Sequence, residues 1–148
     1  MSRDKNLNQA ILEYSNGNFS TSEDIINAIW DEEKGNSKIW NLKSAIASKK
    51  GNHVESITIL IDAKKKFHPN ESICLNLALS YRNINDFDQS IKFYKEAIQI
   101  NDESTNAIFE LTQTYILKED FMSALEVLDN LSLKNKNTKE LNYYYGYI

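Results

Sequence analysis

Apolar residues recur at three- and four-residue spacing along almost the whole chain, which is the spacing of one buried helix face. Within residues 89–100, for example, Ile91, Tyr94 and Ile98 fall on the same face. The pattern predicts helices near residues 4–15, 21–33, 38–49, 54–67, 71–83, 87–100, 105–117, 121–132 and from 138 onward. Because the chain has only four glycines and one proline, we expect short turns between helices rather than a β fold with many turns.

The same pattern of residues returns every 34 positions without an insertion. One column holds small residues, at Ala10, Ser44, Ala78, Thr112 and Gly146. A second column holds aromatic rings, each preceded by an Asn or Asp that we expect to cap the following helix: Asn18-Phe19, Asn52-His53, Asp86-Phe87 and Asp120-Phe121. Two further columns hold small residues at Ser22, Ser56, Ser90 and Ala124, and large apolar residues at Ile26, Leu60, Tyr94 and Leu128. Small residues on both helices of a unit predict that the two helices pack closely.

The third unit shows the fullest form of the repeated pattern. It reads Cys74-x-x-Leu77-Ala78-x-x-Tyr81, followed by Asp86-Phe87, Ser90-x-x-x-Tyr94 and Ala97. This arrangement resembles the tetratricopeptide repeat family, whose units are 34-residue pairs of helices. The fourth unit keeps Leu111-Thr112-x-x-Tyr115, the second keeps Trp40 and Pro69, and the first departs from the pattern at Gln9.

The resemblance implies the fold class and the domain organisation. The fold class is all-α, a right-handed superhelical array of antiparallel helix pairs with about four repeats plus a partial fifth. We expect a single domain over residues 1–148, divided into repeats at about 3–36, 37–70, 71–104 and 105–138 and a partial repeat at 139–148.

Composition and charge argue against several classes of partner. The formal net charge is −4, and arginine occurs only at Arg3 and Arg82, whereas a nucleic-acid binder usually presents a basic face. We therefore expect no nucleic-acid partner. No stretch approaches the roughly 18–20 apolar residues that a membrane span needs, so we expect no membrane partner either. The lone Cys74 excludes an internal disulfide, which fits a reducing compartment and predicts a cytoplasmic location.

The titratable residues do not form a catalytic or metal-binding pattern. Cys74 stands at the Trp position of its unit, so we expect it in the core, and His53 and His68 lack metal-ligand spacing. The run from Lys64 to Lys66 ends a helix, where cations complement the helix dipole. We expect no cofactor, no metal and no catalytic centre, and hence a protein that is not an enzyme by itself.

The family resemblance also implies a binding surface. In arrays of this kind, the first helices of successive units line a concave groove that takes an extended peptide or a partner helix. The groove residues expected from the resemblance are Asn41, Ala45, Lys49, Leu75, Asn76, Leu79, Arg82, Asn83, Asn106, Phe109, Glu110, Gln113 and Leu117. Four of them are apolar where the helix–helix core does not need them, and they either form an exposed docking patch or cover a neighbouring repeat: Leu75, Leu79, Phe109 and Leu117.

Three functions are consistent with this sequence. The first is a scaffold or adaptor that binds a protein or peptide partner in the concave groove. The second is the amino-terminal repeat module of a larger enzyme of the transferase or oxygenase type, because the sequence stops within the aromatic segment Tyr143–Ile148 and bacterial chains that resemble it often carry such a domain after the repeats. The third is a homo-oligomer that forms through the partial repeat at 139–148.

Some members of the family hold the terminal carboxylate of a chaperone tail between lysines, asparagines and an arginine. Asn76 matches one of those asparagines, but Asn106 and Glu110 stand where the last lysine and the arginine should be. Because the carboxylate of Glu110 repels another carboxylate, we expect that a peptide ending in a free acidic carboxylate does not bind. Calorimetric titration at micromolar concentrations tests this expectation, and a saturable heat would contradict it.

Overall fold

The computed structural model describes residues 3–134, 143, 145 and 146, and the secondary structure among them is helical. The eight helices within residues 3–134 are α1 (Arg3–Ser15), α2 (Phe19–Glu33), α3 (Ser37–Lys49), α4 (His53–Lys66), α5 (Glu71–Asn83), α6 (Phe87–Ile100), α7 (Thr105–Leu117) and α8 (Phe121–Lys134). The all-α prediction is confirmed, and the ends of these helices lie within two residues of the predicted ones. The helix predicted from residue 138 onward lies mostly outside the described residues.

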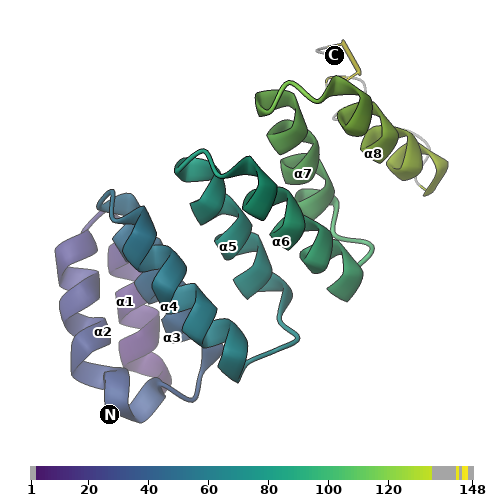
Figure 1. Ribbon diagram of the computed structural model, residues 1–148. Coiled ribbons are helices and arrows are strands. Elements are labelled where there is room, and N and C mark those ends of the chain that lie inside the picture. Colours follow the sequence, from purple (N-terminus) through teal and green to yellow (C-terminus); the bar gives the residue numbers. More distant parts are fainter. Residues whose placement is uncertain (1–2, 135–142, 144, 147–148) are drawn as a thin grey trace.

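The helices form consecutive pairs that follow one another along the array (Figure 1). Each pair is closed by a short turn, so its two helices pack side by side: α1 with α2, α3 with α4, α5 with α6, and α7 with α8. The second helix of each pair also packs on the first helix of the next pair. Neighbouring units therefore share a continuous core, as expected for a helical repeat array.

Small residues occupy the places where the paired helices meet. The small residues of the first helices, Ala10, Ser44, Ala78 and Thr112, are buried, and so are those of the second helices, Ser22, Ser56, Ser90 and Ala124. The hydroxyl of Ser22 donates to the carbonyl oxygen of Ala10 at 2.8 Å, which links α2 to α1. The hydroxyls of Ser56 and Ser80 lie 3.0 Å apart between α4 and α5. These bonds give the buried hydroxyls of Ser22 and Ser56 a partner, so that neither is an unpaired polar group.

The expected capping hydrogen bonds form at the two aspartates and not at the two asparagines. A carboxylate oxygen of Asp86 accepts from the backbone N–H of Gln89 at 3.2 Å, and Asp120 accepts from that of Ser123 at 3.1 Å. Asn18 and Asn52 do stand at the N-cap positions of α2 and α4, but their side chains make no capping hydrogen bond. Their amide groups instead donate to the side chains of Glu13 and Glu55. A carboxylate can only accept and is attracted to the positive end of the helix dipole, whereas an asparagine amide can also donate.

The turn inside each unit requires a residue with positive φ. Gly17 and Gly51 have φ angles of 83° and 84°, and Asn85 and Glu119 have φ angles of 61° and 63° at the equivalent positions of the third and fourth units. Glycine adopts this conformation freely and asparagine tolerates it. Glutamate does not, so the turn before α8 is strained.

The substitution Glu119→Gly removes this strain. We expect it to raise the free energy of unfolding by about 1 kcal/mol, because the left-handed conformation costs a side chain about that much. The matched change Gly51→Ala should lower the free energy of unfolding by a similar amount, although a Cβ at Gly51 meets no neighbouring atom. Urea unfolding of the two variants measures both effects, and a Glu119→Gly protein no more stable than the parent would contradict the assignment of strain.

Candidate functional site

Two hollows open on the side of the array lined by α1, α3, α5 and α7, which we call the first-helix face. The first hollow has a volume of about 400 Å³ and is lined by Tyr14, Ser44, Ala45, Ser48, Lys49, His53, Ser56, Asn76, Leu79, Ser80 and Asn83. The second hollow has a volume of about 290 Å³ and is lined by Ser72, Leu75, Asn76, Leu79, Tyr94, Asn106 and Glu110. Asn76 and Leu79 of α5 line both hollows. The two hollows therefore adjoin each other along α5, and together we call them the groove.

The first hollow is open because small side chains stand where the next unit has large ones. Ser48 of α3 occupies the repeat position of Arg82 in α5, 34 residues later, and Ala45 occupies the position of Leu79. Arg82 fills its place by reaching α7, where a guanidinium nitrogen lies 2.6 Å from a carboxylate oxygen of Glu110 and 3.3 Å from the amide oxygen of Gln113. Ser48 is too short to cross to α5. Its hydroxyl instead lies 3.2 Å from Nδ1 of His53.

The floor of the first hollow is polar, and its hydrogen bonds are made within the protein. The hydroxyl of Ser44 donates to the carbonyl oxygen of Asn41 at 2.8 Å, and Ser56 is paired with Ser80. Lys49 and Asn83 are exposed at the mouth of the hollow. The residues that line this hollow include Lys49 and His53 but no aspartate or glutamate. Its electrostatic potential therefore disfavours a basic ligand group.

The second hollow has a different electrostatic character, because its lining residue Glu110 forms an ion pair with Arg82. Arg82 and Glu110 join α5 to α7, and their side chains are 14% and 33% exposed. The guanidinium carbon of Arg82 also lies 5.9 Å from the centre of the Tyr94 ring. Burial raises the pKa of Tyr94 above its ordinary value, so this phenol stays neutral in the physiological range. The pair cancels its own charge and leaves the second hollow close to neutral.

The structure brings most of the predicted groove residues to the two hollows. Eight of them line the groove: Ala45, Lys49, Leu75, Asn76, Leu79, Asn83, Asn106 and Glu110. Asn41 accepts a hydrogen bond of 3.1 Å from the Asn76 amide, so it supports a lining residue. Arg82 and Gln113 are bonded to each other across α5 and α7.

Two of the apolar candidates lie away from the groove. Phe109 is half-buried and packs against the cluster that contains Leu128 and Leu131 of α8. Leu117 is 51% exposed at the end of α7 and lines neither hollow. The sequence left open whether these apolar residues are exposed for docking or cover a neighbouring helix. Leu79 is exposed in the groove, whereas Phe109 packs against the neighbouring α8.

Several lining residues were not among the sequence predictions. Tyr14 reaches the first hollow from α1. Ser48 of α3, His53 of α4 and Ser80 of α5 also line it. The signal for Ser48 was present in the sequence as a small residue in the column of Arg82. Tyr14 gave no such signal, because the first unit departs from the repeat pattern around it.

The remaining titratable candidates are engaged in packing or in ion pairs. Cys74 is fully buried, and burial raises the pKa of its thiol to about 11, which makes it unreactive as a nucleophile at neutral pH. Lys64 lies 2.8 Å from Glu96, and Lys65 lies 2.8 Å from Asp62. Within the described part of the chain, no group of three or more His, Cys, Asp or Glu side chains could hold a metal ion. In the same part, no helix is long and apolar enough to cross a membrane.

Comparison with known families and structures agrees with this architecture. Residues 71–104 match the family model described as tetratricopeptide repeat. A tetratricopeptide repeat protein from Parabacteroides merdae is 16% identical with a TM-score of 0.80, and the match covers 96% of this chain and 57% of that one. The Cut9–Hcn1 hetero-tetramer of the anaphase-promoting complex contains a chain that is 16% identical with a TM-score of 0.78, over 94% of this chain and 28% of that one.

A third solved structure, MamA from Desulfovibrio magneticus, is 13% identical with a TM-score of 0.78, and the match covers 92% of this chain and 78% of that one. At such low identities these matches show the fold alone. The chain spans little more than half of the first of these structures and less than a third of the second. No protein with a curated description matches this chain.

The half-buried Arg82–Glu110 pair should stabilise the contact between the third and fourth units. In a double-mutant cycle with Arg82→Gln and Glu110→Gln, we expect a coupling energy of about 1–2 kcal/mol, because partial burial reduces screening by water. The exposed Lys34–Asp31 pair, with side chains 52% and 88% exposed, is the matched control and should show much weaker coupling. Urea unfolding supplies the free energies. Equal coupling in the two cycles would show that the Arg82 pair has no special role.

Proposed function

We propose that this chain, which has the tetratricopeptide repeat fold and a third unit that matches the family, is a protein-binding scaffold that holds an extended peptide or a partner helix along its first-helix face. The fold is that of protein–protein interaction scaffolds generally. The observation that carries the proposal is that the two hollows adjoin at Asn76 and Leu79 on the same face of the array. Two adjoining hollows suit a chain-like ligand, which can place one side chain in each, better than an isolated small molecule.

The polar residues of the groove suit a peptide backbone. Asn76, Asn83 and Asn106 bring side-chain amides to the groove from α5 and α7. An amide group offers both a donor and an acceptor, so it can satisfy the N–H and the C=O of a peptide unit. Leu75 and Leu79 lie between these amides and supply apolar contact. We infer that the ligand binds mainly through its backbone, with its side chains entering the two hollows.

The charges around the groove determine which charged side chains a ligand can carry. Lys49 and His53 border the first hollow, and no carboxylate lines it. In the second hollow the Arg82–Glu110 pair is already neutralised. A ligand segment with a basic side chain over the first hollow is therefore disfavoured. We further propose that the protein acts in the cytoplasm, since its single cysteine fits a reducing compartment.

The substitution Ser48→Arg tests the groove directly, because it places in the first hollow the side chain that fills the equivalent space one unit later. Peptides selected on the immobilised parent protein from a random display library serve as ligands. We expect Ser48→Arg to weaken their binding by at least about tenfold, which corresponds to ~1.4 kcal/mol. Binding is measured by fluorescence anisotropy.

Two control variants separate loss of the groove from loss of structure. Ser48→Ala removes the same hydroxyl but leaves the hollow open, and Ser20→Arg adds the same charge on the exposed surface of α2. Both should bind like the parent, and circular dichroism should show equal helicity in all four proteins. Undiminished binding by Ser48→Arg, or failure to select any peptide, would count against the proposal.

A further inference from the structure

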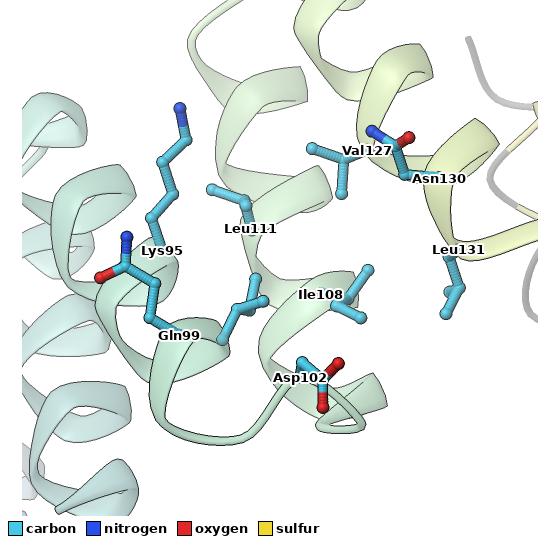
Figure 2. A pocket seen from close by; sticks show the side chains of 9 residues that line it. Lys95, Gln99, Asp102, Ile108, Leu111, Val127, Asn130 and Leu131 are labelled. Carbon is cyan, nitrogen blue, oxygen red and sulfur yellow. The ribbon is translucent and has the colours of Figure 1, made fainter. Parts of the chain in front are cut away.

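A separate cavity lies between the second helices of the third and fourth units, away from the groove. It has a volume of about 310 Å³ and is lined mainly by apolar side chains. Figure 2 shows Ile108 and Leu111 of α7 between α6 and α8, with Val127 and Leu131 projecting from α8. Ile108, Leu111 and Leu131 are buried in the protein core. Side chains of the core therefore form the floor of this cavity, which opens to solvent.

The preceding unit shows what normally fills this space. Phe93 of α6 stands 34 residues before Val127, and its ring stacks on that of Tyr81 with centroids 5.6 Å apart. Lys64 and Glu96 close the same place from α4 and α6 with an ion pair of 2.8 Å.

In the next unit these three groups are replaced. Valine replaces Phe93, Ile98 replaces Lys64, and Asn130 replaces Glu96. Ile108 and Leu131 replace the smaller Cys74 and Ala97 and fill part of the space. The cavity thus corresponds in position to an aromatic ring and to the ion pair that covers it, and an aromatic side chain supplied from outside would occupy the place of that ring.

The rim of the cavity carries opposite charges at its two ends. Lys95 projects from α6 at one end, and Asp102 lies at the other end (Figure 2). The Lys95 side chain is exposed, and its ammonium lies 5.6 Å from the ring of Tyr115. A carboxylate beside the entering ring is attracted to the ammonium group of Lys95. Charge complementarity therefore orients the ligand.

We propose that this cavity is a second docking site, which takes one aromatic side chain of a partner peptide whose neighbouring residue is acidic and faces Lys95. The volume lies at the lower end of the ~300–1,000 Å³ that small-ligand pockets span, which suits a single ring. Aromatic rings bury large apolar areas with few rotatable bonds, so one ring can serve as an anchor. The site is independent of the groove on the first-helix face.

The probe is the blocked dipeptide N-acetyl-Glu-Phe-amide at millimolar concentrations. Backbone amide chemical shifts of the ¹⁵N-labelled full chain should change saturably in α6, α7 and α8, with the largest changes near Val127 and Leu131. N-acetyl-Gln-Phe-amide should bind at least threefold more weakly, because it lacks the charge that Lys95 attracts. N-acetyl-Glu-Ala-amide should give no saturable change, because it lacks the ring.

Substitutions in the protein test separately the binding of the ring in the cavity and the attraction of the acidic residue to Lys95. Val127→Phe restores the residue of the third unit and should abolish binding, whereas Val54→Phe makes the same change at a position that is 71% exposed and should leave it intact. Lys95→Glu changes an exposed side chain and should reverse the preference for Glu over Gln in the probe. Ser48→Arg, which fills the groove, should leave dipeptide binding unchanged.

Several results would overturn the proposal. Shifts that lie outside α6–α8, or that persist in Val127→Phe, would remove the cavity as the site. An unchanged preference in Lys95→Glu would remove the acidic neighbour, and this variant remains informative even if Val127→Phe does not fold. If light scattering finds a dimer that Val127→Phe converts to a monomer, the cavity is filled by a second copy of the chain and not by a peptide partner.

Discussion

The close approach of the two helices within each unit is the constraint on which the rest of the structure depends. Small residues face each other at this contact in all four units, from Ala10 and Ser22 in the first to Thr112 and Ala124 in the fourth. A larger side chain would push the paired helices apart. Because each unit packs only on its neighbours, the displacement would pass to the next unit and alter the spacing of α1, α3, α5 and α7. The groove therefore owes its shape to side chains that never touch a ligand.

The features of interest arise where one unit departs from another. Ser48 opens the first hollow in a place that Arg82 fills one unit later. Val127 opens the cavity beside α7 in a place that Phe93 fills one unit earlier. The shared residues of the repeat build the scaffold, and the unshared residues shape the two proposed binding sites. This division is expected when function resides in sites placed on a common fold.

The sequence predicted the helices well because their signals are local and are repeated four times. The 34-residue period placed each turn, and the apolar spacing placed each buried face. Side-chain interactions across helices were less predictable. Asn18 and Asn52 match the sequence position of a cap, but the nearby carboxylates of Glu13 and Glu55 compete for their amides.

The sequence predicted which helices form the groove better than it predicted which side chains line it. The family resemblance placed Asn76, Leu79 and Glu110 on the first-helix face, where they line the two hollows. It could not show that Phe109 turns toward α8, since this depends on the sizes of the residues it meets there. Tyr14 also contributes from an atypical first unit, where the repeat offers no template. A register assigns a residue to a helix face, but only the packed neighbours decide what remains open to solvent.

The cavity beside α7 also has a mechanical consequence. In a linear array, the cohesion between adjacent units is a local quantity that depends on the side chains at their shared boundary. At the boundary between the second and third units, Phe93, Lys64 and Glu96 fill this place, whereas at the next boundary Val127 stands in the position of Phe93. The cavity therefore removes apolar contacts between the third and fourth units, and a side chain that filled it would increase the cohesion of the array at this point.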